Sequence, residues 1–295
     1  MADFGYLITA MVTPMKDDFS VDYKKAEELA VYLAKNGSDS IVVHGTTGES
    51  PTLTHEEEYE LYRVVKNALK GTKCKLIAGT GSNSTATTIN STKQAEKIGC
   101  DGAMVVVPYY NKPSAEGLYQ HFKAIAENTS LPIIIYNIPG RTGINMMPET
   151  LAKVAQIKNY IGLKDAAGNL DQTSATIAAC PKEFKLWSGD DSLTLPMLSV
   201  GAIGVISVAS HIAGNEIKEM VMAYHSGNVK KAAEFHLKLL PLFKVLFITA
   251  NPTPVKAALA MVNRPVGIPR LPLIEANEKE KQQIREVLKG LNLLK

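Results

Sequence analysis

One of several similar units in the chain reads Ile161-Gly-Leu-Lys-Asp-Ala-Ala-Gly-Asn-Leu170, a short apolar run that ends at a turn. Alternation along a strand predicts that Gly162 and Lys164 lie on one face and that Ile161 and Leu163 lie on the other. Because Gly162 has no side chain, we expect open space beside the lysine amine. The unit therefore predicts a buried strand that carries a lysine to its carboxyl end.

Short apolar runs of this kind alternate with amphipathic segments along the chain, which is the pattern of βα units around a parallel sheet. Eight such units predict a (β/α)8 barrel, in which working residues lie at the carboxyl ends of the strands. A doubly wound open sheet is the alternative, but Thr13-Pro-Met-Lys-Asp-Asp18 replaces the glycine-rich turn that such folds place after the first strand. The expected strands are Tyr6–Val12, Ser40–Val43, Lys75–Ala78, Ala103–Val107, Ile133–Tyr136, Ile161–Lys164, Lys185–Trp187 and Gly204–Val208.

Capping residues mark the helices between these strands. Thr54-His-Glu-Glu57 has the capping-box pattern, Gly71 is expected to close the helix that follows, and Gly37 and Gly99 are similar helix ends. Proline near a helix start, as at Pro148 and Pro196, costs little because the first amides have no partner in the helix.

The chain beyond the eighth strand is longer than one closing helix requires. No linker-like composition precedes it, so we expect residues 1–225 to form the barrel that carries the site and residues 226–295 to pack on that barrel. The helices expected in this region are Glu216–Ser226, Val229–Phe247, Pro254–Met261 and Glu278–Leu288.

The composition is that of a folded globular protein. The 295 residues are 45% hydrophobic and 21% charged, which is enough to bury a large core in two ordinary domains or in one barrel. The net charge of +3 comes from 32 basic and 29 acidic residues scattered along the chain, so we expect no nucleic-acid-binding surface. Three well-separated cysteines indicate reduced thiols. No targeting segment or membrane span is recognisable, and we expect a soluble cytoplasmic protein.

Motifs that would indicate a metal ion or a cofactor are incomplete. His55-Glu-Glu-Glu-Tyr59 begins like a zinc-binding helix but has tyrosine where the second histidine is required. Gly79-Thr-Gly81 lacks the third glycine of a dinucleotide-binding turn, and the chain has neither a Gly-Lys-Ser/Thr phosphate loop nor a Gly-x-Ser-x-Gly elbow. We therefore expect no metal and no cofactor.

Polar residues follow several strands at the ends that would face one mouth of the barrel. They are Gly45–Ser50 after the second strand, Pro108–Asn111 after the fourth, Tyr136–Gly143 after the fifth and Lys164 at the sixth. Taken singly, each has an ordinary structural explanation: a turn before a helix, a pair of surface aromatics, a buried phenol, or a lysine whose amine reaches solvent.

Taken together, these residues have the chemistry of an aldolase that acts on a 2-oxo acid. Backbone amides of the Gly-Thr-Thr-Gly turn can hold a carboxylate, and the hydroxyls of Thr46, Tyr110 and Tyr136 can transfer protons. Arg141 can bind a second carboxylate through two parallel hydrogen bonds. A desolvated Lys164 amine has a lowered pKa and can attack a carbonyl carbon to form a Schiff base.

The same segments, in this order, resemble the dihydrodipicolinate synthase and N-acetylneuraminate lyase family of class I aldolases. The resemblance extends from Thr13-Pro14 through Ser188-Gly-Asp-Asp191 and Gly204-Val-Ile-Ser207 to Asn251-Pro252, and so covers nearly the whole chain. A single one of these segments would be a weak indication, whereas the ordered combination is specific.

The resemblance implies a role for each residue at the strand ends. Lys164 is identified with the lysine that forms an imine with pyruvate, Tyr136 with the phenol that relays protons, and Thr46 with the middle of that relay. The active unit is then at least a dimer, usually a dimer of dimers, because the relay tyrosine comes from a neighbouring subunit. The other implied roles are pyruvate-carboxylate binding by Thr47, a main-chain carbonyl near the amine from Ile206, second-carboxylate binding by Arg141, and the neighbour's relay tyrosine at Tyr110.

Two positions separate the branches of this family. Sialic acid lyases have serine at the position of Thr46 and lack the arginine found at Arg141, and several sugar-acid aldolases also lack it. The chain therefore resembles the branch that condenses pyruvate with L-aspartate 4-semialdehyde in the diaminopimelate route of lysine biosynthesis. A short semialdehyde with its own carboxylate needs a fixed cation, whereas a long sugar needs a roomier polar pocket. The alternatives are an aldolase for a 2-oxo-3-deoxy sugar acid and a binding barrel without catalysis.

The resemblance also implies a possible effector site for lysine. Lysine-inhibited members use a histidine and a glutamate there, and the matching positions in this chain are Glu58 and Thr87. Without a carboxylate at Thr87 the amine of lysine loses a partner, so we expect weak or no inhibition. His44 has no assigned role and is expected to be a packed or surface histidine. The family's other effector contacts are kept by Ser50, His55, Asn83 and Tyr109.

Overall fold

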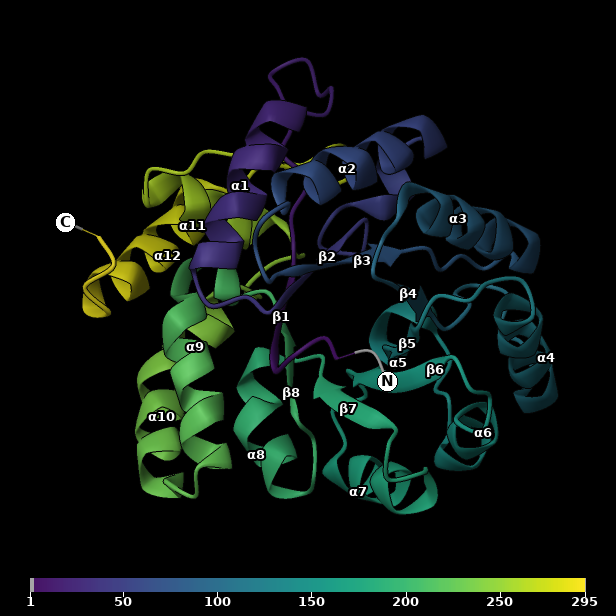
Figure 1. Cartoon of the computed structure of the whole chain (residues 1–295). Helices are drawn as coiled ribbons and strands as arrows, with labels where there is room; N and C mark the ends of the chain where they lie inside the picture. Colours follow the sequence, from purple (N-terminus) through teal and green to yellow (C-terminus); the bar gives the residue numbers. More distant parts are fainter. Residues whose placement is uncertain (1–2, 295) are drawn as a thin grey trace.

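A closed barrel of eight parallel strands forms the centre of the molecule, described for residues 3–294 by a computed structural model. Neighbours in sequence are neighbours in the sheet, and β1 closes the barrel by pairing with β8 (Figure 1). This confirms the predicted barrel and shows that the open sheet was the wrong alternative. The strands are β1 (Leu7–Ala10), β2 (Ser40–Val43), β3 (Lys75–Gly79), β4 (Gly102–Val106), β5 (Ile133–Asn137), β6 (Tyr160–Asp165), β7 (Lys185–Ser188) and β8 (Gly204–Ser207).

A ring of helices covers the outside of the barrel (Figure 1). Each strand is followed by at least one helix, as the βα pattern predicts. Two short 3-10 turns, η1 (Ser50–Thr52) and η2 (Asp191–Leu193), lie between strands and helices. The helices of the ring are α1 (Tyr23–Lys35), α2 (His55–Ala68), α3 (Thr85–Ile98), α4 (Ala115–Ala126), α5 (Pro139–Thr142), α6 (Pro148–Val154), α7 (Leu170–Ala179), α8 (Thr194–Ser199) and α9 (Ser210–His225).

Most of the predicted helix boundaries are confirmed. The Thr54 and Glu57 side chains form the capping box at the start of α2, and Gly99 ends α3 with a left-handed φ of 88°. Gly71 was wrong as the end of α2, because the helix stops at Ala68. The chain then makes one more turn, in which the Leu69 amide donates to Val65, before it reaches Gly71.

The C-terminal helices are α10 (Val229–Val245), α11 (Thr253–Met261) and α12 (Glu278–Gly290). They pack on one another and on α9, so they form a layer against the barrel (Figure 1). The predicted start of α9 at Glu216 was six residues late, because the helix already begins at Ser210 and continues through a kink at Ala213. The division of the chain at residues 225 and 226 stays a prediction.

The hydrophobic core has two parts, one on each side of the sheet. Outward-facing residues such as Leu163 pack against the helices in the larger cluster. Inward-facing residues fill the barrel, which is therefore a packed core and not a pore. The buried members of the inner cluster are Phe4, Ile8, Ala10, Val42, Ile77, Met104, Ile134, Tyr136, Ile161, Trp187 and Ile206.

A bulge in β6 corrects the predicted orientation of Ile161. The register with β5 runs from Tyr160 directly to Gly162, so Ile161 is an extra residue that turns into the barrel. The space expected beside Gly162 is also filled. A Cβ at Gly162 would lie 2.6 Å from the ring of Trp187 and 2.2 Å from a main-chain oxygen, so only glycine fits there.

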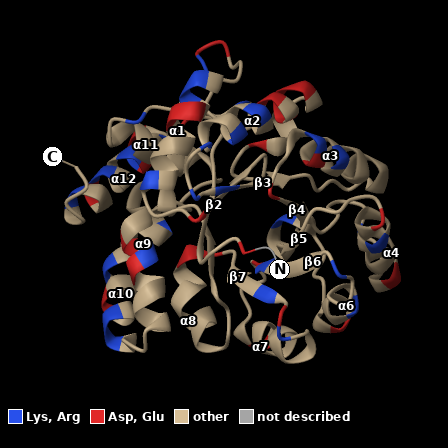
Figure 2. Cartoon of the chain, in the orientation of Figure 1, with Lys and Arg blue, Asp and Glu red and all other residues tan. Residues whose placement is uncertain are grey.

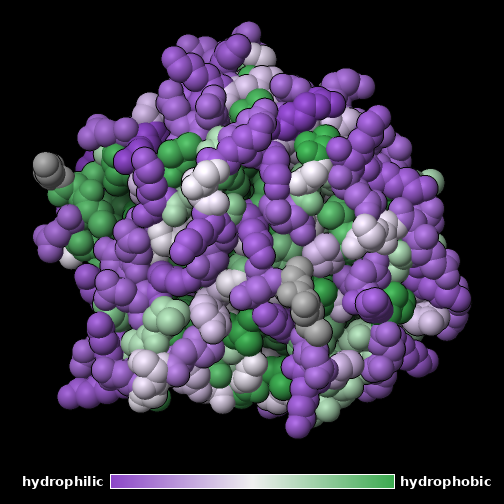
Figure 3. All heavy atoms as spheres, viewed as in Figure 1, coloured by the Kyte–Doolittle hydropathy of each residue, from purple (hydrophilic) through white to green (hydrophobic). Residues whose placement is uncertain are grey.

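Charged residues of both signs are spread over the outer helices in the view of Figure 2. The same face is mostly hydrophilic in Figure 3, with hydrophobic areas between the hydrophilic residues, the most extended of them at the left of the view. This distribution agrees with the small net charge of the sequence and shows no extended basic stripe on that face. Among residues 3–294, no helix combines the length and the apolar character needed to cross a bilayer.

Candidate active site

A cavity of about 610 Å³ opens beside the carboxyl ends of β2 to β5. Four residues that the sequence identified at separate strand ends line this one cavity: Thr46, Tyr110, Tyr136 and Arg141. Apolar walls come from Met104, Val106 and Ile138. The structure therefore brings hydroxyls and a guanidinium together in a largely apolar space, as ligand sites require.

Lys164 lies in the barrel interior beside this cavity. It is the fifth residue of β6, its side chain is buried, and Nζ lies 4.1 Å from the centroid of the Tyr136 ring. Burial lowers the pKa of the Lys164 amine to about 8, a shift that Asp191 opposes and the positive charge of Arg141 assists. A sizeable fraction of the amine is therefore neutral near physiological pH, the form that can attack a carbonyl.

Tyr136 lines the cavity, and its ring lies against the Lys164 amine. Burial raises the pKa of its phenol to about 12, while Arg141 and a polar contact with Thr46 act in the opposite direction. The phenol is consequently protonated at neutral pH and can exchange its proton only with a neighbouring group. Thr46 and Lys164 flank it on two sides, which is a suitable arrangement for a short proton relay.

The Gly45–Ser50 turn presents Thr46 and Thr47 at the end of β2. Three main-chain hydrogen bonds close the turn: Gly48 and Ser50 donate to Gly45, and Glu49 donates to Thr46. Thr46 is partly exposed and faces the cavity, whereas Thr47 is buried and its hydroxyl accepts a hydrogen bond of 2.9 Å from Asn251. The two threonines thus have different environments, one open to a ligand and one anchored to the C-terminal region.

Ile206 and Asp191 lie on the far side of the barrel interior. Ile206 is buried in β8 and pairs with Ile8 of β1. The Asp191 carboxylate accepts hydrogen bonds from the Ser207 hydroxyl at 2.5 Å and from the amides of Val208 and Ala209 at 3.0 Å. It therefore fixes the end of β8 directly after Ile206 and contributes the negative charge felt by Lys164.

Two residues of this site were not predicted individually from the sequence. Asp191 and Asn251 were recognised only as parts of the segments that carry the family resemblance. Asp191 follows β7 and Asn251 follows α10 in the sequence. Neither position by itself indicates that the side chain reaches the site. Only the closed barrel brings Asp191 beside β8 and Asn251 beside Thr47.

Tyr110 differs from the other residues of the site because it is 88% exposed. Its backbone has a left-handed φ of 74°, uncommon for a large residue, and its amide donates to Thr142 beyond Arg141. Arg141 itself belongs to the short α5 and is exposed at the cavity. The two residues are thus held by connected loops.

A second cavity of about 230 Å³ adjoins the first, and both share His44, Ser50 and Tyr109 in their walls. The second cavity brings together most of the predicted effector residues: Ser50, His55 and Tyr109, with Glu58 and Thr87. Asn83 does not line it, since its main-chain oxygen accepts a hydrogen bond from Asn111 and Ser82 takes its place in the wall.

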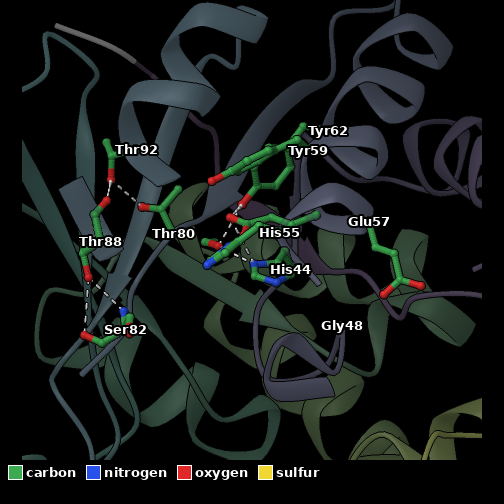
Figure 4. A network of polar contacts seen from close by, with 12 residues as sticks. His44, Gly48, His55, Glu57, Tyr59, Tyr62, Thr80, Ser82, Thr88 and Thr92 are labelled. Atoms are coloured by element: carbon green, nitrogen blue, oxygen red, sulfur yellow. Dashed lines mark hydrogen bonds and ion pairs between the residues drawn. The ribbon is translucent and has the colours of Figure 1, made fainter. Parts of the chain in front are cut away.

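His44 belongs to a buried polar network behind this second cavity (Figure 4). Nδ1 of His44 lies 2.9 Å from the Gly79 carbonyl and 3.5 Å from the Glu58 carboxylate. The Tyr62 hydroxyl lies within hydrogen-bond distance of both acceptors and can donate its proton to either one, and His55 lies 2.9 Å from the other Glu58 oxygen. The expectation of a packed histidine is confirmed, and its packing is polar: the ring links the start of the Gly45 turn to α2 and β3.

No group of three or more histidine, cysteine, aspartate or glutamate side chains suited to a metal ion occurs within residues 3–294. The cysteines in this part of the chain are free thiols, and burial raises the pKa of Cys74 and of Cys100 to about 12. These thiols are therefore poor nucleophiles at neutral pH.

Comparisons with known proteins agree with this geometry. Residues 3–291 match the model of the dihydrodipicolinate synthetase family. The chain is 55% identical to the 4-hydroxy-tetrahydrodipicolinate synthase of Desulforamulus reducens over 99% of each chain, and 54% identical to that of Thermosynechococcus vestitus over the full length of both. A crystal structure of DHDPS from Cyanidioschyzon merolae with lysine bound superimposes with a TM-score of 0.97, at 52% identity and 99% coverage of each chain.

Proposed function

The chain belongs to the dihydrodipicolinate synthetase family and acts as a 4-hydroxy-tetrahydrodipicolinate synthase, and we propose that Lys164 and its neighbours carry out this reaction as follows. The neutral Lys164 amine attacks C2 of pyruvate, and loss of water gives an imine. The observation that carries this assignment is the burial of the amine against Tyr136, which lowers the pKa of the amine to about 8.

Tyr136 and Thr46 transfer the protons of this step. The phenol donates a proton as hydroxide leaves the carbinolamine, and the relay then removes a proton from the pyruvate methyl group to form the enamine. Their contact beside Lys164 supports this role. Tyr110 completes the relay. In this proposal Thr47 and the amides of its turn bind the pyruvate carboxylate, and the Ile206 carbonyl accepts a hydrogen bond from the Lys164 amine.

The enamine carbon then attacks the aldehyde carbon of L-aspartate 4-semialdehyde, whose carboxylate binds Arg141. Attack by the amino group of the second substrate on the imine carbon closes the ring and releases Lys164. No metal ion and no cofactor are needed. The protonated imine accepts the electron pair of the broken C–H bond, and the resulting enamine supplies that pair to the new C–C bond.

Substrate choice separates this function from that of a sugar-acid aldolase. At a constant pyruvate concentration, the enzyme is expected to turn over L-aspartate 4-semialdehyde far faster than it cleaves a 2-oxo-3-deoxy sugar acid. Measurement of kcat/KM for both substrates on one preparation checks this. A higher value for the sugar acid would contradict the proposed function while leaving the imine chemistry intact.

Replacing Arg141 by methionine is expected to raise KM for the semialdehyde by about 10- to 100-fold, because a charge-assisted pair to its carboxylate is lost. KM for pyruvate should change little. Arg141→Lys is the matched variant. It keeps the charge but loses the two parallel hydrogen bonds, so its KM for the semialdehyde should lie between that of the wild type and that of Arg141→Met. Equal effects on both substrates would contradict the assignment.

We also propose that the active form is a homo-oligomer, at least a dimer and built as a dimer of dimers, in which a neighbour supplies Tyr110. The exposure of this aromatic side chain at the cavity rim supports the proposal. A cytoplasmic location fits an enzyme of amino-acid biosynthesis.

Inhibition by lysine is expected to be weak or absent, because Thr87 offers no carboxylate in the second cavity. Steady-state assays with added lysine check this. Half-maximal inhibition at a lysine concentration below about 1 mM would indicate that the ammonium group is well paired, and it would contradict the prediction. Thr87→Glu is the informative variant, since it should strengthen inhibition. If the wild type is strongly inhibited, the buried Glu58 carboxylate is the group in that cavity that can replace the missing partner.

A further inference from the structure

A buried ion pair joins the Gly45–Ser50 turn to the C-terminal helices. Glu49 Oε1 lies 2.5 Å from Lys256 Nζ, and the two side chains are 1% and 2% exposed. Lys256 belongs to α11, which lies on the same side of the barrel as α1 and α2 in Figure 1. Neither residue takes part in the reaction described above, yet Glu49 is only two residues from Thr47.

Glu49 is held in an unfavourable backbone conformation. Its φ of 58° is left-handed, a region that residues with a side chain rarely adopt. Such a conformation persists only where its surroundings determine it. Here the second carboxylate oxygen accepts a hydrogen bond of 2.8 Å from the Arg270 amide, so one oxygen of Glu49 is ion-paired with Lys256 and the other is hydrogen-bonded to Arg270.

The partners of Glu49 are themselves anchored. Lys256 Nζ also donates to the Ile268 carbonyl at 3.3 Å, within the segment that leads to Arg270. The Arg270 guanidinium binds Glu57 at the start of α2 through two nitrogens and donates to the Thr52 carbonyl directly after the turn. The turn is therefore clamped between α11, the segment before α12 and the start of α2.

A second contact reaches the turn from the same region. Asn251, two residues before α11, donates to the hydroxyl of Thr47, and both residues are buried. The C-terminal region thus holds the turn at Thr47 and at Glu49. Thr46, which faces the cavity, lies directly before these two fixed points.

Stability alone is a weak explanation for such a pair. Taking two charges out of water costs several kcal/mol per ion, and apolar residues of similar volume often stabilise a core equally well. The pair also restricts the position of the main chain at Glu49. A carboxylate with a partner on each oxygen restricts the main chain that carries it, and misplacing a catalytic group by about 1 Å costs roughly 100-fold in rate.

We propose that Glu49 and Lys256 are a positioning pair through which the C-terminal helices fix the Thr46–Thr47 turn in the geometry that binds the pyruvate carboxylate and relays protons. The inference rests on the proposed function of this turn. It assigns to the C-terminal region a part in the chemistry of a site whose proposed catalytic side chains come from the barrel.

The test uses the full-length oligomeric enzyme and the double variant Glu49→Gln/Lys256→Met. Each single change would leave a buried charge without its partner and could prevent folding, whereas the double variant removes both charges. We expect the double variant to keep the wild-type circular dichroism spectrum, with KM for pyruvate raised about tenfold and KM for the semialdehyde changed less than about twofold. Imine trapping with pyruvate and borohydride should slow in parallel.

Two further variants keep the result interpretable. Glu49→Asp retains both charges and shortens the side chain by one methylene, so it should fold and still raise KM for pyruvate. If the double variant does not fold, Glu49→Asp tests the positioning role by itself. Lys66→Met/Asp101→Asn removes an ion pair of 2.8 Å far from the turn and should leave both KM values unchanged.

Wild-type KM for pyruvate in the folded Glu49→Asp and double variants would overturn the positioning role. So would equal changes in both KM values, which indicate a general loss of structure. If wild-type enzyme itself fails to trap pyruvate on Lys164, the proposed function is wrong and the positioning role falls with it, an outcome that the wild-type control identifies separately.

Discussion

Replacing Lys164 by methionine is expected to lower kcat/KM for the condensation by at least about 1,000-fold, because it removes the buried amine that lies against Tyr136 and forms the imine. Methionine has a similar length and suits the apolar surroundings of the amine, so the variant should fold. Burial of the charged form of lysine is unfavourable, and the variant should unfold at the same or a slightly higher temperature than the wild type. Steady-state kinetics and thermal unfolding measure the two quantities.

Lys185→Met is the matched control for this change. Lys185 lies on the neighbouring strand β7, but at its amino end, where it pairs with Asp3 near the surface. Its removal should leave kcat/KM within about twofold of the wild type, since exposed ion pairs contribute little. A Lys164→Met enzyme that keeps even a tenth of the wild-type activity would rule out covalent catalysis by this residue.

Replacing Tyr136 by phenylalanine is expected to lower kcat by about 100- to 10,000-fold, the range for loss of a general acid-base group. The ring and its contact with Lys164 remain, so KM for pyruvate should change much less than kcat. Loss of the hydroxyl also removes the contact with Thr46, and the relay is then interrupted at its centre. Rapid-quench measurement of imine formation should show that this step, and not product release, has slowed.

Tyr160→Phe separates the effect of a lost buried hydroxyl from that of a lost relay. Tyr160 is also buried, its hydroxyl donates to the Phe122 carbonyl at 2.6 Å, and burial raises its pKa, but it lies outside the cavity. The variant should lose about 1 kcal/mol of unfolding free energy and keep its kcat. Similar kcat values for the two variants would contradict the role of Tyr136.

The barrel could be predicted because its signal is repeated. Every strand is a short apolar run between turn residues, and the boundaries of β2 were predicted to the residue. The orientation of Ile161 could not be predicted, because a bulge depends on the register with β5 and leaves no mark on local alternation. The start of α9 was misplaced for a related reason: small residues and an internal kink hide its first turn.

Residues of the candidate site could be predicted where a reactive side chain lies at or just after the carboxyl end of a strand. Lys164, Tyr136 and Thr46 fall at such positions. In the structure Tyr136 and Thr46 line one cavity, and Lys164 lies against the Tyr136 ring. The residues that support them were not predictable. Asp191, Asn251 and Lys256 reach the site from segments far along the chain, and their side chains serve main-chain groups and hydroxyls whose positions depend on the closed barrel.

The most direct test of imine catalysis is to incubate the enzyme with pyruvate, reduce with borohydride and locate the modified residue by peptide mass spectrometry. We expect one reduced pyruvyl group per subunit on Lys164, with labelling that increases as the pH rises through about 8, where the amine loses its proton. Lys185→Met should label like the wild type and Lys164→Met should not label at all. An unmodified Lys164, or a label on another lysine, would contradict the mechanism.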